Sequence, residues 1–201
     1  MFVFRTLLTA GLASLIAACA TVEPSEAPRR FDTFETSADI PLTSYDTVFI
    51  APIAVGEEVT SRVGFRPMLT TDRTRPLSED DIDRATTRLR TTLIGALDDV
   101  VAFADAPGED VLTIAVELTD LQANRPTSAE LAAVPGLSIG SIYTGGAAVI
   151  VNFAEGDMLI ATATDRSIDL PLNETNAGAA TWFEADRYFN QLASKVANLF
   201  G

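Results

Sequence analysis

The sequence predicts an α+β fold, a mixed and largely antiparallel sheet of about five strands with two helices packed on one face. Residues 111–121 alternate apolar and polar side chains, as a half-buried strand does. Residues 147–153 and 158–164 flank a Glu-Gly-Asp turn, which is typical of an antiparallel hairpin. Residues 78–97 and 181–200 each carry one apolar stripe at helical spacing. Helices and strands in these proportions favour a layer of helices on a sheet.

The first predicted strand covers residues 47–55, where β-branched and aromatic residues are concentrated. Pro52 lies inside it and has no amide hydrogen to donate, so we expect an edge or a bulge there. Residues 56–77 follow as a long loop with four arginines and two prolines. A short strand at 63–65 is compatible with this sequence. A loop of this length is either functional or mobile.

The first predicted helix opens at Ser78, which has capping-box spacing to Asp81. Its stripe consists of Ile82, Ala85, Leu89, Leu93 and Leu97. A short strand is expected at 100–103, and 122–142 is irregular, with one or two helical turns at 128–134. The closing helix buries the stripe Trp182, Ala185, Phe189, Leu192, Val196 and Leu199.

The first residues have the pattern of an export signal, in which Arg5 precedes an uncharged apolar run at residues 7–18. A bilayer-spanning helix needs about 20 apolar residues, so this run is short for a permanent anchor. The string Leu15-Ile16-Ala17-Ala18-Cys19 resembles the lipobox of bacterial lipoproteins. That resemblance implies a diacylglyceryl thioether on Cys19. The alternative is an ordinary secretory signal cleaved near Ala18, with Cys19 as a bystander.

These observations divide the chain into a lipoprotein signal peptide at 1–18, a flexible tether at 19–40 and a single α+β domain at 41–201. Ala20, rather than Asp, follows the cysteine, which for a Gram-negative host suggests the outer membrane. We therefore expect a membrane attachment through lipid on Cys19 and a domain that faces the periplasm.

Composition excludes several classes of function. The net charge is −14, and cleavage would remove Arg5 and make it one unit more negative, so the chain repels nucleic acid. There is no histidine, the commonest general base and transition-metal ligand. Cys19 is the only cysteine and is assigned to lipid. We therefore expect no cofactor, no metal site and no catalytic residue.

Several segments in a fixed order along residues 42–201 resemble one known family. They are Tyr45-Asp46-Thr47-Val48-Phe49-Ile50-Ala51-Pro52, Asp110-Val111-Leu112-Thr113-Ile114-Ala115-Val116-Glu117-Leu118-Thr119-Asp120, Gly145-Gly146-Ala147-Ala148, Asp165-Arg166, and a helix with Trp182, Phe189, Leu192 and Ala193. In this order they are similar to DUF3313, a family of bacterial lipoproteins named for its unknown function. The resemblance implies a lipoprotein and transfers no site residue.

Three other patterns have ordinary structural explanations. The acidic run at 79–83 lacks calcium-loop spacing and favours a helix N-terminus. The glycines between 136 and 146 are not followed by a phosphate-loop lysine. Trp182 lies on the core stripe of its helix, which favours packing over sugar stacking.

The functional prediction is a non-catalytic binding module whose partner is another envelope protein. The surfaces most suited to binding are 56–77 and the apolar segment 122–143. The alternative is a carboxylate-dependent hydrolase of envelope glycan, which would draw its acid pair from Glu117, Asp120, Asp165 and Asp169.

Overall fold

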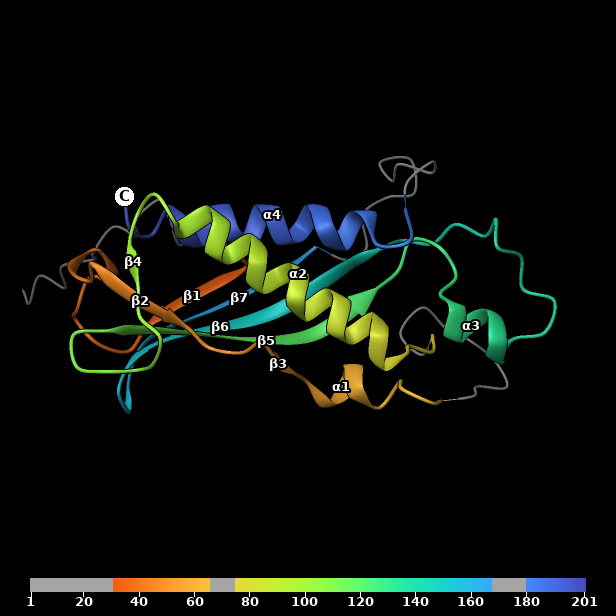
Figure 1. The fold of residues 1–201 in the computed structure, drawn as a ribbon, viewed down its shortest axis with the longest axis horizontal. Coiled ribbons are helices and arrows are strands. Elements are labelled where there is room, and N and C mark those ends of the chain that lie inside the picture. The colour runs from red at the N-terminus through yellow and green to blue at the C-terminus, as the bar shows by residue number, and fades with distance from the viewer. Residues whose placement is uncertain (1–30, 66–74, 168–179) are drawn as a thin grey trace, which may run out of the picture.

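A computed structural model gives the structure of the protein and describes residues 31–65, 75–167 and 180–201. Within these residues, one seven-stranded sheet is covered on one face by two long helices (Figure 1). The strand order is β1-β7-β6-β5-β2-β4, and β3 also pairs with β5. The α+β prediction is confirmed, although the expected count of about five strands is too low.

The centre of the sheet consists of three long antiparallel strands, β5 (Leu112–Gln122), β6 (Gly146–Glu155) and β7 (Met158–Ser167). The predicted hairpin is β6 and β7. Alternate side chains of β5 and β6 point to the helices and are fully or almost fully buried: Leu112, Ile114, Val116, Leu118, Ala147, Val149, Val151 and Phe153. The other face of these strands is open and mixes polar residues such as Thr113 and Glu117 with the apolar Ala148 and Ile150.

The predicted strand 47–55 is two strands, β2 (Thr47–Ile50) and β3 (Ala54–Val55). Both run parallel to β5, and β2 also pairs in parallel with β4 (Ala102–Phe103). Pro52 lies in the break between them, where the chain cannot donate a ladder hydrogen bond. This split accounts for one of the two strands by which the observed sheet exceeds the predicted one.

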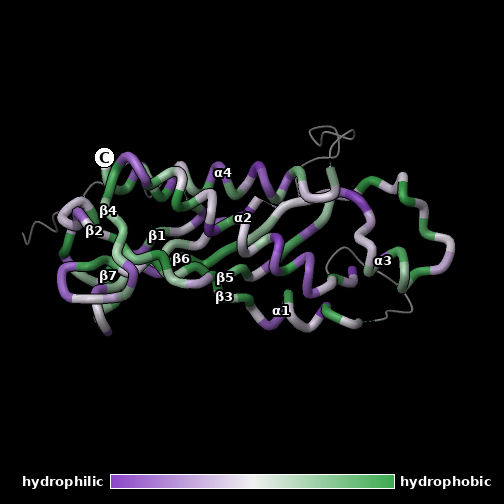
Figure 2. Tube along the Cα trace, viewed as in Figure 1, coloured by the Kyte–Doolittle hydropathy of each residue, from purple (hydrophilic) through white to green (hydrophobic). Residues whose placement is uncertain are grey.

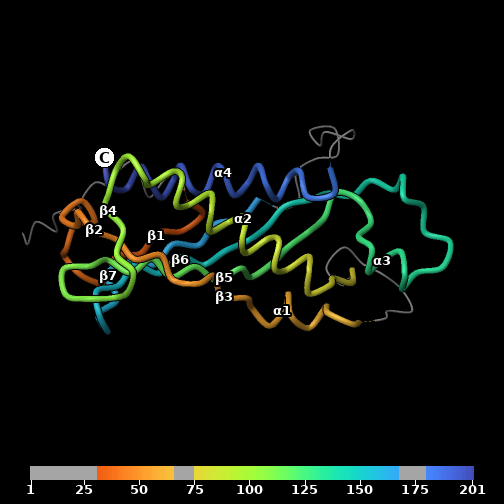
Figure 3. The backbone as a smooth tube through the Cα atoms, in the orientation of Figure 1, coloured from red at the N-terminus to blue at the C-terminus, as the bar shows by residue number. Residues whose placement is uncertain are grey.

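The helical layer consists of α2 (Glu79–Leu97) and α4 (Phe183–Ala197), which pack against each other over the sheet (Figure 3). The Ser78 side chain accepts a hydrogen bond from the Asp81 amide, and the Asp81 carboxylate accepts one from the Ser78 amide, so the capping box is present. The predicted stripes are the buried faces, apart from Ile82, which is only partly buried. Polar residues mark the outer faces of both helices (Figure 2).

The second missed strand is β1 (Thr33–Thr36), which pairs antiparallel with residues 161–164 of β7. It falls inside the segment 19–40 that we expected to be a flexible tether, and Phe31 before it is buried. The boundary at residue 40 therefore needs correction. Three of the four side chains of β1 are exposed, so its sequence has no apolar alternation to reveal it.

The predicted signal peptide and Cys19 lie outside the described residues. In the part of the chain that the structure covers, neither long helix nor any shorter one is apolar over the length that a bilayer crossing requires.

Candidate binding surface

The two segments that the sequence marked as surfaces meet at one end of the molecule. The segment 56–77 contains α1 (Glu57–Thr60) and an isolated parallel bridge between Val63 and Leu77. The segment 122–143 contains α3 (Ser128–Ala133), in agreement with the predicted helical turns. α3 and the loop after it lie beyond the end of the helical layer, at the opposite end of the molecule from the C-terminus, whereas α1 lies alongside the sheet near β3 and β5 (Figure 1).

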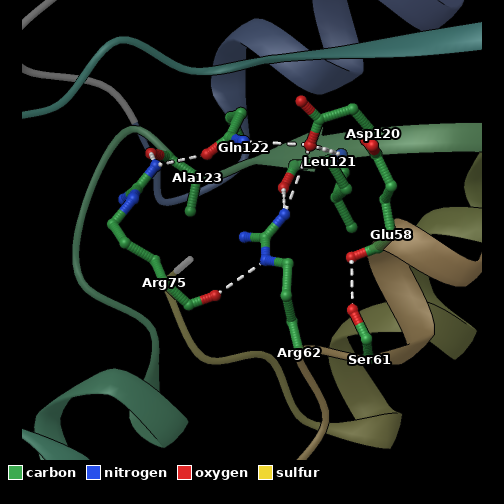
Figure 4. A network of polar contacts seen from close by, with 8 residues as sticks. All are labelled: Glu58, Ser61, Arg62, Arg75, Asp120, Leu121, Gln122 and Ala123. Atoms are coloured by element: carbon green, nitrogen blue, oxygen red, sulfur yellow. Dashed lines mark hydrogen bonds and ion pairs between the residues drawn. The ribbon is translucent and has the colours of Figure 1, made fainter. Parts of the chain in front are cut away.

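Arg62 joins the first segment to the end of β5. Its side chain is 5% exposed, and its Nη1 donates to the Leu121 carbonyl at 2.7 Å and to Asp120 Oδ1 at 3.3 Å. Its Nε donates to the carbonyl oxygen of Arg75 at 2.8 Å (Figure 4). Burial is the main cause that lowers the pKa of Arg62, and the Asp120 carboxylate opposes this shift. The guanidinium keeps its proton in either case.

Arg75 joins the same region to the second segment. Its Nη2 donates to the Ala123 carbonyl at 2.8 Å and to Gln122 Oε1 at 3.2 Å (Figure 4). Its guanidinium carbon lies 4.1 Å from the centre of the Tyr143 ring, and its Nη1 lies 3.8 Å from Glu130 Oε2. The Tyr143 hydroxyl donates to the other Glu130 oxygen at 3.2 Å, and burial is the main cause that raises the pKa of Tyr143.

This network is unusual because arginine is rarely buried unless it is paired. Arg62, Arg75 and Glu130 are all buried in this structure. A buried charge without its partners is costly, so each arginine favours the geometry that keeps its acceptors in place. The two arginines therefore fix the positions of residues 120–123 and 143 relative to the first segment.

Apolar side chains are exposed on the surface that this network supports. Phe65 is 44% exposed, Ile142 is 44% exposed and Ile139 is 74% exposed. Residues 131–154 contain no charged side chain, in a chain with a net charge of −14. We call Phe65, α3 and residues 134–143 the tip surface; apolar residues recur along its loop in Figure 2.

A small hollow of about 160 Å³ lies within the tip surface. Its lining residues lack polar side chains, although polar backbone atoms also reach the hollow: Gly64, Phe65, Pro76, Leu77, Ala129, Ala132 and Ala133. Alanines on α3 leave room for a side chain from outside, because their own side chains are short. The hollow can therefore accept one apolar side chain of a binding partner.

Of the candidate acids, Glu117 and Asp165 border one open groove on the sheet, and Asp120 is not part of that groove's described lining. Asp120 is bound to Arg62, and Asp169 lies outside the described residues. Asp165 faces α4, where both its oxygens accept from Lys195 at 2.7 and 2.8 Å. Burial raises the pKa of Asp165, and Lys195 opposes that shift. Glu117 lies on the opposite, open face of the sheet.

Asn124 is a positioning residue that the sequence analysis missed. Its Oδ1 accepts a hydrogen bond from the Glu184 amide at 2.9 Å, so it caps the start of α4 from outside the helix. The backbone amide of Asn124 donates to the Thr181 carbonyl, and its backbone carbonyl accepts from the Tyr143 amide. No local pattern reveals a cap supplied by a residue so distant in the sequence.

Comparisons with known proteins give one family and distant structural neighbours. No curated protein matches the chain. The PelC dodecamer from Paraburkholderia phytofirmans has a TM-score of 0.43 at 10% identity, covering 81% of this chain and 97% of that chain. A DUF330 protein from Xanthomonas campestris has a TM-score of 0.40 at 12% identity, covering 75% of this chain and 81% of that one. The family model DUF3313, described as a protein of unknown function, matches residues 35–164, from β1 to β7, and the chain belongs to that family.

Proposed function

We propose that this protein is a lipid-anchored lipoprotein of the bacterial cell envelope that binds another envelope protein through the tip surface and performs no chemistry itself. The observation that carries the proposal is the exposure of Ile139 and Ile142 in an uncharged segment that ends at Tyr143, whose ring contacts buried Arg75. Exposed apolar patches with a polar surround are typical of protein interaction sites.

The anchor part of the proposal rests on the lipobox at Cys19. The chain between Cys19 and Phe31, the first described residue, spans at most roughly 40 Å when extended. Two or three acyl chains on one cysteine would hold the protein firmly, whereas one chain binds only marginally. Metabolic labelling with palmitate tests this directly. We expect label in the full chain and none in Cys19→Ser, and label that persists in the variant contradicts the anchor.

A photocrosslinking amino acid at position 139 tests the tip surface in intact cells. Val100 is the matched control position, because it is 42% exposed and precedes β4 at the other end of the sheet. We expect a discrete protein adduct from position 139 and none from position 100. The adduct should disappear when Ile142→Lys is added, because a charge there must be desolvated on binding. An adduct that survives Ile142→Lys, or forms equally from position 100, contradicts binding through the tip.

The non-catalytic part of the proposal is supported by the ion pairs that hold two of the three described candidate acids, Asp120 with Arg62 and Asp165 with Lys195. A hydrolase of the alternative type needs two acids about 5–10 Å apart across a cleft. Alanine substitution of Glu117 and Asp120 leaves crosslinking at position 139 unchanged if the tip is the working surface. Loss of a measured glycan turnover in these variants, with the fold intact, would instead favour the enzyme.

A further inference from the structure

An open groove of about 470 Å³ lies on the sheet face that the helices leave uncovered. Its floor comes from two adjacent rows of the sheet. Glu117, Ile150 and Thr164 are register partners across β5, β6 and β7, and Ala148 and Arg166 are partners in the next row. Ile150 and Ala148 are only partly buried, so the middle of the floor offers apolar surface to a ligand.

Carboxylates surround this floor. Glu57 and Glu58 border it from α1, which packs over β5 where the Gly56 amide donates to the Leu118 carbonyl at 2.9 Å. A β-carbon at Gly56 would lie 3.0 Å from Glu117 Oε1, so the Glu117 carboxylate lies close against the start of α1. Asp32 borders the groove from the opposite side, beside β1.

Among the described residues, these carboxylates have almost no cationic partner. Arg166 is the single basic residue among the groove's described lining, and its Nε lies 3.9 Å from Asp32 Oδ2. Both side chains are more than half exposed, so this pair contributes little. Among the described basic side chains, none forms an ion pair with Glu57, Glu58 or Glu117. Within the part of the chain that the structure describes, the groove therefore presents largely unpaired carboxylates around an apolar floor.

We propose that this groove binds a basic segment of a partner protein, in which arginine or lysine alternates with apolar residues. The aliphatic stems of such side chains lie on Ile150 and Ala148, and their charged ends reach the surrounding carboxylates. A single metal ion fits the groove poorly, because no described group of three acidic side chains converges closely enough to hold one. A peptide instead distributes its charges over several separated carboxylates.

The groove is distinct from the tip surface, so an experiment that contradicts the groove proposal leaves the proposed function untouched. A fluorescein-labelled Arg-Leu-Arg-Leu-Arg peptide is the probe, and its anisotropy is followed with the full chain in detergent. The test variant is Glu58→Gln with Glu117→Gln. The matched control is Asp98→Asn with Asp99→Asn, which removes the same charge from exposed positions at the end of α2. Urea midpoints of both variants verify that each is folded.

We expect the groove variant to bind the probe about ten-fold more weakly, because each lost carboxylate removes a close charge partner. The control variant should stay within about two-fold of the parent, because its charges act only over a screened distance. Equal loss in both variants shows attraction to the acidic protein as a whole and overturns the proposal. So does an absence of probe binding by the parent chain.

An Arg-Ser-Arg-Ser-Arg peptide tests the floor separately. It keeps the charge of the probe and lacks its apolar side chains, so we expect weaker binding by the parent chain. The substitution Ile150→Ser should weaken the Arg-Leu peptide and leave the Arg-Ser peptide unchanged. If both peptides bind equally to the parent chain, the apolar floor plays no part, and the proposal is wrong. The tip variant Ile142→Lys should bind the probe normally, whatever its effect on crosslinking.

Discussion

The Nε of Arg62 donates a hydrogen bond to the backbone carbonyl of Arg75 at 2.8 Å, so one buried arginine holds the other in position. Arg75 in turn contacts the backbone at Ala123 and the ring of Tyr143. The two arginine side chains thus connect four parts of the chain: the region of α1, the end of β5, α3 and the loop after α3. Substituting the first arginine should therefore disturb contacts made by the second.

Arg62→Met should lower the free energy of unfolding by about 3 kcal/mol, because the carbonyls of Leu121 and Arg75 lose their donor and Asp120 loses its cation. Urea denaturation measures the change. The control is Arg88→Met, whose side chain is 45% exposed and 4.0 Å from its carboxylate partner. That change should cost at most about 0.5 kcal/mol. Equal costs for the two would show that the buried network does not stabilise this end of the protein.

Asn124 and Gly145 should show strong energetic coupling. A β-carbon at Gly145 would collide with the Asn124 amide group, so Gly145→Ala alone should cost about 1–3 kcal/mol. Asn124→Ala alone removes the cap on α4 and should cost about 1 kcal/mol or more. In the double variant the collision is gone, so the added cost of Gly145→Ala should largely disappear. Additive costs in a double-mutant cycle would contradict this contact.

The Tyr45 hydroxyl should make the protein lose stability in alkali. Burial is the first cause, and Glu155 the second, of a pKa raised to about 12. The unfolded chain releases this proton near pH 10, so the stabilisation is complete below that pH and declines as pH rises toward 12. Urea midpoints across this window should fall less in Tyr45→Phe, which has no proton to lose. Identical declines in the two proteins would remove Tyr45 as the cause.

Lys195→Met should destabilise the protein in a pH-dependent way. Asp165 would then be a buried carboxylate without its cation, at a cost of about 3 kcal/mol near neutral pH. Burial already raises the pKa of Asp165 and Lys195 lowers it, so removing Lys195 raises it further. The deficit should therefore shrink as pH falls toward about 4, where the unfolded aspartate also becomes protonated.

Adding Asp165→Asn to Lys195→Met should recover much of the lost stability at neutral pH. The amide carries no charge that needs a partner in the interior. Lys195→Arg is the matched control and should change stability little, since the charge is kept. A deficit in Lys195→Met that is constant with pH would point to lost packing instead of an unpaired carboxylate.

Local periodicity explains which elements could be predicted from the sequence. The apolar stripe of α2 and the alternation of β5 are each complete within one segment, so burial follows from spacing alone. β1 is different, because its partner residues lie in β7 and its own side chains are mostly exposed. Only the pairing makes it a strand, and pairing at long range leaves no local pattern.

The candidate surface was predicted in location but not in structure. The uncharged apolar residues of 122–143 marked that segment, and exposed Ile139 and Ile142 agree with a surface role. Arginine is normally exposed, so the four arginines of 56–77 do not predict that Arg62 and Arg75 are buried. Their acceptors are largely backbone carbonyls, which every residue has, so the network has no sequence signature.

The pairing of β1 with β7 also constrains the order in which the protein folds. Thr33 and Thr164 share a hydrogen bond of 2.6 Å across a separation of 131 residues. A chain that emerges amino end first, from a ribosome or through a pore, exposes Thr33 long before Thr164 exists on the same side. That outer edge can close only after the hairpin has arrived, so the earliest residues to appear are among the last to acquire their native neighbours.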